Sequence, residues 1–364
     1  MAVYRSVRDL DWTLLAITLA ICGLGILQIY SATYATKWAD AWWKQMLYVT
    51  VGMMVMWAVT KFDYHWLMEH VPIFYAVCVL LLIVTAVLGA TVFGSKRWIP
   101  LVGGFHLQPS EFVKLALVLF VARYMSELKT ERLEMVDFAK LGAMVGVPMA
   151  LVMKQPDLGT SLCYLPILAI GVFLGGIRWQ YAAAIGLVFV LMLPLAWNFY
   201  LKDYQKARLV SFLDPEGDPL QSGYQVIQSR IAVGAGGMWG KGVTRGTQTQ
   251  LQFIPVPHTD FIFSAFGEEH GFVGVVVALG LYFVLLMQIV QNAQMAPDRA
   301  GIYICMGVAA LLLFHVFVNV AMVVGRMPVT GIPLPLMSAG GSSTISFFMM
   351  LGLVNNVRLR RFVN

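Results

Sequence analysis

The chain has 364 residues, of which 59% are hydrophobic and 12% are charged, and its mean hydropathy is +0.75. Soluble domains carry about 25% charged residues, so this composition excludes a soluble protein and indicates a polytopic membrane protein. The net charge of +6 reflects membrane topology and anionic lipid rather than nucleic-acid binding. The four cysteines lie far apart within apolar runs, so they predict neither a disulfide framework nor a metal site.

Ten apolar stretches are long enough to cross a bilayer, which takes about 20 residues each. They cover residues 12–31, 43–60, 71–93, 107–125, 138–153, 158–176, 180–200, 259–290, 300–324 and 338–357. The first stretch is too long for the core of a signal peptide, so it is interpreted as a retained helix. The predicted fold is an all-α polytopic membrane protein of about ten transmembrane helices, forming one domain over residues 1–364.

An even number of spans places both termini on one side of the membrane. Basic residues gather at the ends that face this side: Arg5, Arg8, Arg123, Lys129, Arg132, Arg358, Arg360 and Arg361. The positive-inside rule therefore predicts that both termini are cytoplasmic. Residues 201–258 then form a long extracytoplasmic loop between the seventh and eighth spans.

Charged side chains flank and enter the fourth span. Lys96, Arg97 and Trp98 precede it on the outer side, where a tryptophan is ordinary at the membrane interface. Glu111 and Lys114 follow at i,i+3 spacing and share one face of the helix. The sequence leaves two interpretations open for this pair: an internal ion pair, or a Lys114 that faces a cavity and binds an anionic head group.

The long loop contains ordered features. Tyr224, Ile227 and Ile231 recur at helical spacing, which predicts a short amphipathic helix lying in the membrane interface. A glycine-rich turn follows at residues 234–242, and Arg208 offers an outer cation whose fork of donors suits phosphate.

The segment PVPHTDFIFSAFGEEHGFVG at 255–274 joins this loop to the eighth span. His258, Thr259 and Asp260 stand where a helix is expected to begin. Thr259 or Asp260 could simply cap this helix. Alternatively, Asp260 is a general base, since an ionised carboxylate can take the proton from a nearby hydroxyl of a substrate.

Further ionisable residues lie deeper in the same span. Glu268 and Glu269 are interpreted as a structural buried pair that is satisfied by a cation or by proton uptake, and His270 is a candidate partner. The three prolines and three glycines between 327 and 343 fit a helix-breaking loop or a re-entrant segment that lines a water-filled cavity.

Five motifs together resemble the SEDS family, and within it the rod-shape (RodA) members more than the division (FtsW) members. They are RWIPLVGGFHLQPSEFVKLAL at 97–117, KQPDLGTSL at 154–162, FLDPEGDPLQSGYQVIQSRIAVGAGGMWGKG at 212–242, FIPVPHTDFIFSAFGEEHGFVG at 253–274 and MPVTGIPLPLMSAGGSS at 327–343. The resemblance covers essentially the whole chain. One departure is His270, where the family more often has leucine.

The resemblance implies a peptidoglycan glycosyltransferase of the bacterial inner membrane that polymerises lipid II on the outer face. It implies that Asp260 is the essential aspartate, and that Trp98, Glu111 and Lys114 match other functionally important positions. Arg208 carries over less directly, and Arg97, His258 and Thr259 complete the predicted substrate-binding set. The family also implies a class B penicillin-binding protein as partner, which supplies the transpeptidase.

Other functions remain alternatives at this point. A lipid II flippase would use Glu111, Lys114 and Glu268 along a transport path, and a scaffold would need no general base. A divalent cation, Mg²⁺ or Mn²⁺, could assist a pyrophosphate leaving group. Asp157, Asp260 and Glu268 are candidate ligands, although no ligand spacing selects them.

Overall fold

The computed structural model describes residues 10–92, 95–100, 106–128, 133–177, 179–201, 203–217 and 223–361. Several features singled out in the sequence lie outside these ranges. They are the charges Arg5, Arg8, Lys129 and Arg132, residues 101–105 of the motif at 97–117, and residues 218–222 of the loop motif.

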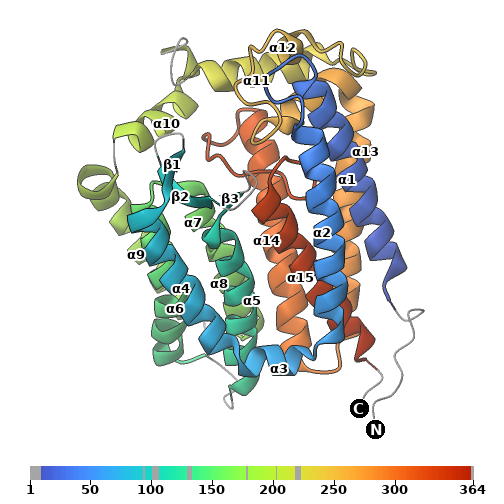
Figure 1. The fold of residues 1–364 in the computed structure, drawn as a ribbon. Coiled ribbons are helices and arrows are strands. Elements are labelled where there is room, and N and C mark those ends of the chain that lie inside the picture. Colours follow the sequence, from blue (N-terminus) through green and yellow to red (C-terminus); the bar gives the residue numbers. More distant parts are fainter. Residues whose placement is uncertain are drawn as a thin grey trace.

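Long helices run side by side and form the body of the molecule (Figure 1). The helices are α1 (Trp12–Thr33), α2 (Ala41–Lys61), α3 (Tyr64–Glu69), α4 (Val71–Leu88), α5 (Pro109–Glu127), α6 (Met135–Lys154), α7 (Leu158–Leu162), α8 (Leu165–Leu174), α9 (Trp179–Leu195), α10 (Asp203–Leu213), α11 (Tyr224–Ala235), α12 (Thr247–Gln250), α13 (Ile262–Gln294), α14 (Arg299–Val323) and α15 (Gly341–Leu359). A π-helical turn at Ala196–Tyr200 follows α9, and a 3-10 turn at Pro215–Gly217 follows α10.

Each of the ten stretches predicted to span the membrane coincides in sequence with a helix or, for residues 158–176, with the pair α7 and α8. Five of the described helices, α1, α4, α6, α13 and α14, are both long and apolar enough to cross a bilayer by themselves. The predicted multi-pass helical architecture is therefore confirmed in its coarse form.

Aspartate side chains cap several helices. The carboxylates of Asp11, Asp157 and Asp298 accept backbone N–H groups at the first turns of α1, α7 and α14.

The expectation of a purely helical chain is wrong at one place. Strands β1 (Ala90–Val92), β2 (Ser95–Pro100) and β3 (His106–Leu107) form a small antiparallel sheet in the order β1-β2-β3. Helix α4 ends at Leu88, and Gly89 follows it. The sheet therefore begins within residues 71–93, the stretch predicted as the third span. Arg97 and Trp98 are thus carried on a strand.

The beginning of the first helix and the end of the last helix meet. Arg358 Nη1 of α15 lies 2.8 Å from Asp11 Oδ2, and the Asp11 backbone N–H donates to Asn355 Oδ1 at 2.9 Å. In Figure 1 this end of the bundle is opposite to α11 and α12. The start of α1 and the end of α15 therefore share one face, and α11 and α12 lie at the other.

The 201–258 connection is largely helical. Helix α11 lies across the ends of the long helices (Figure 1), so the predicted short helix exists. Helix α11 buries Val226, Ser229 and Ala232 against the rest of the protein, whereas Ile231, on the predicted apolar face, is 45% exposed. The reason is packing on α13, where Ser229 Oγ lies 2.7 Å from Ser264 Oγ.

Helix α13 is interrupted at Gly271, whose φ of 64° and ψ of −166° are not helical. The glycine-rich turn pairs with the backbone at this break: Phe272 N–H donates to Gly237 O at 2.8 Å, and Lys241 N–H donates to Glu268 O at 3.1 Å. Backbone groups that a broken helix leaves unpaired need partners at membrane depth. The glycine-rich turn supplies them, because its lack of Cβ atoms permits this close approach.

Candidate active site

Asp260 lies just before α13, whose N-cap is Phe261 and has no side-chain cap. The interpretation of Thr259 or Asp260 as a helix cap is therefore wrong. Among the described residues, the Asp260 carboxylate accepts no hydrogen bond, whereas its backbone carbonyl accepts one from Asn319 Nδ2 at 2.8 Å. The backbone is held in place and the carboxylate is left available.

An irregular segment between α14 and α15, residues 329–339, packs beside Asp260. Ser338 Oγ donates to Thr259 O at 2.8 Å, and the Ala339 N–H donates to His258 O at 2.9 Å. Gly331 lies so close that a Cβ there would stand 3.3 Å from Asp260 Oδ2. The non-helical backbone predicted at 327–343 is confirmed as far as Gly340, because α15 begins at Gly341, and this segment supports the aspartate.

Two arginines place positive charge near Asp260. Burial raises the pKa of the Asp260 carboxyl, and the positive charges of Arg97 and Arg208 act in the opposite direction. Arg97 Nη1 pairs with Asp157 Oδ2 at 3.1 Å, and Arg208 Nη1 donates to Val329 O at 3.1 Å. The predicted outer cations thus converge electrostatically on Asp260, from strand β2 and from helix α10.

The remaining predicted neighbours lie around this centre. His258 is buried and its ring lies 5.7 Å from the Trp38 ring, and burial lowers its pKa to about 4. The imidazole is therefore neutral near pH 7. Thr259 is partly buried and donates to Val256 O at 3.2 Å. Trp98 lies on β2 with its ring edge-on to His106 at 6.3 Å.

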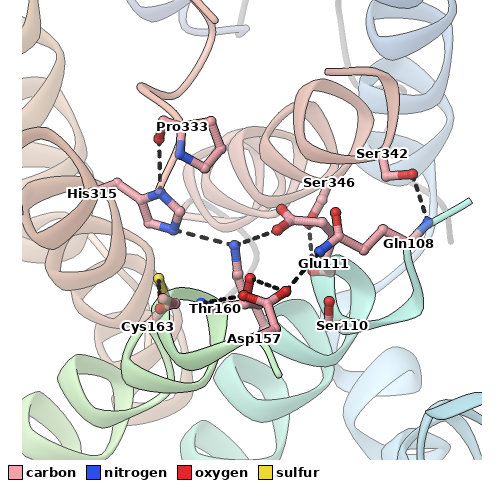
Figure 2. A network of polar contacts seen from close by, with 12 residues as sticks. Gln108, Ser110, Glu111, Asp157, Thr160, Cys163, His315, Pro333, Ser342 and Ser346 are labelled. Atoms are coloured by element: carbon pink, nitrogen blue, oxygen red, sulfur yellow. Dashed lines mark hydrogen bonds and ion pairs between the residues drawn. The ribbon is translucent and has the colours of Figure 1, made fainter. Parts of the chain in front are cut away.

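Glu111 and Lys114 form a buried ion pair in α5, with Lys114 Nζ 2.7 Å from Glu111 Oε1. Lys114 is 0% exposed, and its Nζ also lies 3.2 Å from His315 Nε2 (Figure 2). The interpretation that Lys114 faces a cavity is wrong, and the internal ion pair is correct. The pair belongs to a polar network that reaches the segment beside Asp260, because His315 Nδ1 lies 3.2 Å from Pro333 O.

Asp157 contacts residues of several elements near the start of α5. Its carboxylate accepts from Thr160 Oγ1 at 2.9 Å and from Gln108 Nε2 at 3.3 Å (Figure 2), and it also pairs with Arg97. Within the described ranges, no group of three or more His, Cys, Asp and Glu residues converges. The residues named as candidate metal ligands therefore do not fit a protein-built metal site.

Glu268 belongs to a separate structural cluster. Its carboxylate accepts hydrogen bonds from Lys241 Nζ at 2.8 Å and from the N–H and Oγ1 of Thr249 at 3.0 and 2.8 Å. Glu269 accepts from Ser31 Oγ at 2.6 Å. The predicted structural role of both glutamates agrees with these contacts. His270 is not their partner in the described part of the chain, and instead stacks on Phe266 at 4.3 Å.

Two site residues escaped sequence reasoning. His315 and Asn319 lie within the ninth apolar stretch and carry no motif, so nothing local distinguished them. Their spacing of four residues places both on one face of α14. A buried histidine and asparagine on the same helical face were the available signal.

Comparison with known proteins identifies the family. A sequence model of the FtsW/RodA/SpoVE family, described as cell cycle protein, matches residues 12–361. The chain belongs to this family. Curated members include the peptidoglycan glycosyltransferase RodA of Treponema pallidum (strain Nichols), which is 35% identical over 98% of this chain and 99% of the relative. They also include the probable peptidoglycan glycosyltransferase FtsW of Geobacter sp. (strain M18), which is 37% identical over 98% of both chains.

A solved structure of this family agrees with the fold. A chain from a peptidoglycan synthase complex, described as coordinating polymerization and crosslinking, matches with a TM-score of 0.82 and 33% identity. The match covers 98% of this chain and 99% of that chain. The family membership and the enzyme class expected from the motifs, a peptidoglycan glycosyltransferase, are confirmed by these relatives.

Proposed function

We propose that this family member polymerises lipid II into glycan strands during cell elongation, with Asp260 as the general base. The observation that carries the proposal is the state of the Asp260 carboxylate. Its backbone is anchored by Asn319, and no described residue donates a hydrogen bond to its carboxylate. A general base must be held in a fixed position, and its carboxylate must remain able to accept a proton from the substrate.

The proposed reaction is an inverting glycosyl transfer. Asp260 takes the proton from the 4-hydroxyl of the acceptor GlcNAc as that oxygen bonds to the anomeric carbon of the donor MurNAc. The bond from this carbon to undecaprenyl pyrophosphate breaks, and the pyrophosphate leaves with the electron pair. Arg97 and Arg208 stabilise the charge that develops on the leaving group. Lys114, buried against Glu111, supports the site from behind.

The charges around Asp260 suit this role. A carboxyl whose pKa is raised by burial is a stronger base than one in water, provided that it is still ionised near pH 7. Arg97 and Arg208 favour the ionised form. The same two cations therefore serve the base before the reaction and the leaving group during it.

We place this site on the outer face of the bacterial inner membrane. The proposed topology has ten spans, with both termini in the cytoplasm. It is supported by the contact between Asp11 and Arg358 at one end of the bundle, because α11 and α12 lie at the opposite end (Figure 1).

The proposed partner is a class B penicillin-binding protein that cross-links the product. This assignment rests on the structural relative, which comes from a complex that coordinates polymerization and crosslinking. Elongation, rather than division, is proposed from the loop motif at 212–242, because the RodA and FtsW relatives match the chain over nearly equal lengths.

Product formation in detergent tests this proposal. The purified chain and its transpeptidase partner are mixed with lipid II in detergent, where the two sides of a membrane no longer exist. The proposal predicts glycan polymers. A lipid II transporter, or a scaffold, would release no polymer under these conditions, and that outcome would overturn the proposed function.

A further inference from the structure

Two wholly buried side chains on α14 hold the backbone that surrounds Asp260. Asn319 Nδ2 lies 2.8 Å from the carbonyl oxygen of Asp260 and 2.8 Å from that of Ile332. His315, four residues earlier, has Nδ1 3.2 Å from Pro333 O. Both side chains are 0% exposed. One face of one helix therefore fixes the positions of the Asp260 backbone and of the segment beside it.

The contacts of His315 define its proton arrangement. A carbonyl oxygen can only accept, so Nδ1 carries the proton that is donated to Pro333 O. The Lys114 ammonium can only donate, so Nε2 is the acceptor. The ring is thus a neutral imidazole in one tautomer, and it joins the Glu111–Lys114 pair to the irregular segment (Figure 2).

Asn319 uses both protons of its amide on backbone carbonyls. Its Oδ1 is buried and has no partner among the described residues. A buried acceptor without a partner is unfavourable and rare in folded proteins. Asn319 therefore keeps an unfavourable unpaired oxygen while both of its N–H groups donate to the carbonyls of Asp260 and Ile332. We infer that its role is to hold these two carbonyls in place.

The position of the Asp260 carboxylate depends on these backbone anchors. No described residue donates a hydrogen bond to the carboxylate. Among the described residues, its direction is therefore not fixed by a hydrogen bond of its own. Gly331, next to Ile332, lies directly against Oδ2. A shift of the 331–333 backbone would therefore move the surface on which the carboxylate rests.

We propose that His315 and Asn319 are positioning residues for Asp260, and that His315 connects the buried Glu111–Lys114 pair to the base. The proposal rests on the proposed function of Asp260. It gives the ion pair a role in the reaction without contact with substrate: the pair sets the tautomer and place of His315, and His315 sets the place of Pro333.

The first test separates kcat from KM in lipid II polymerisation by the chain and its transpeptidase partner. His315→Leu should lower kcat by about 10²-fold, the effect of a displacement near 1 Å at a reacting group, with little change in KM. His315→Gln should recover most of this loss, since an amide keeps one donor and one acceptor. His70→Leu, at an exposed histidine at the start of α4, is the matched control and should leave kcat unchanged.

The second test asks whether the effect passes through Asp260. In the Asp260→Asn background, His315→Leu should lower the residual rate no further, because the group that it positions is already lost. Asn319→Ala should behave in the same way. If His315→Leu does not yield folded protein, Asn319→Ala replaces it in both experiments. Thermal unfolding of each variant reports folding independently of the rate.

The outcomes distinguish the two proposals. If Asp260→Asn alone keeps the wild-type rate, the proposed function fails. If Asp260→Asn loses activity and His315→Leu lowers the residual rate by its full factor again, only the positioning role fails. Loss of activity in His315→Gln equal to that in His315→Leu would also overturn the positioning role.

Discussion

Gly331 lies against the carboxylate of Asp260, at a distance where an added Cβ would stand 3.3 Å from Oδ2. Its φ of +72° is in the left-handed region, which glycine adopts without the steric cost that a Cβ imposes. The backbone shape beside the base therefore depends on the absence of a side chain at this one position.

Gly331→Ala should lower the polymerisation rate more than it lowers stability. The left-handed backbone costs an alanine about 1–2 kcal/mol, and the new methyl group also presses on Asp260. Gly325→Ala is the matched control, because its φ is +73° and its Cβ would meet the flexible Arg230 side chain and, at an ordinary contact distance of 3.4 Å, Val226 Cγ1. Steady-state rates and thermal unfolding of both variants test this, and equal rates would contradict it.

The pH dependence of kcat/KM should respond to Arg208. Burial raises the pKa of Asp260, and the positive charge of Arg208 lowers it. Activity requires the ionised base, so it falls as the pH drops through this pKa. Arg208→Gln removes the charge that favours ionisation, which raises the pKa further and moves the acidic limb to higher pH. Arg245→Gln, an exposed position on the same connection, should leave the limb in place. An unmoved limb in Arg208→Gln would count against the electrostatic assignment.

The Glu111–Lys114 pair should behave as a buried ion pair. Removing one partner leaves the other charge uncompensated, so Glu111→Leu or Lys114→Met alone should cost about 3–5 kcal/mol of stability. The double variant should recover much of that stability, yet remain slow because His315 loses its partner. Replacing the exposed Asp40–Lys44 pair, which also lies within one helical turn, should cost less than about 1 kcal/mol. Full activity in the double variant would refute a role for the pair in the reaction.

Glu268 should control the order of the 241–249 loop. Glu268→Ala removes the acceptor for Lys241, Gln248 and Thr249, at about 1–3 kcal/mol for each buried group left unpaired. Hydrogen exchange at the backbone amides of Gln248 and Thr249 should become faster. Glu216→Ala, at an exposed glutamate, is the control. Unchanged protection of both amides would show that the loop is held by other contacts.

Hydropathy predicted the helices well because membrane spans carry a strong, continuous signal. It extended the third span to residue 93, however, and so missed the sheet that carries Arg97 and Trp98. Short strands after Gly89 look like the continuation of an apolar helix. The side of α11 that packs on α13 was not predicted either, since Ser229 is buried by its contact with Ser264, which local periodicity does not reveal.

The site was predictable where charge interrupts apolar sequence. Asp260, Arg97 and Arg208 were found in this way, and the structure brings their charges together. His315 and Asn319 were not found, because their partners are backbone carbonyls of a segment distant in sequence from Asp260. Such contacts exist only after α14 and the 329–339 segment have packed.

The most direct test of the account is the polymerisation rate of Asp260→Asn in complex with the transpeptidase partner. Asparagine keeps the size of the side chain and the backbone contact with Asn319 but cannot take a proton. The account predicts a loss of about 10²–10⁴-fold, the usual contribution of a general base. Asp203→Asn, at an exposed aspartate that begins α10, should polymerise lipid II normally. A wild-type rate in Asp260→Asn would contradict the central claim.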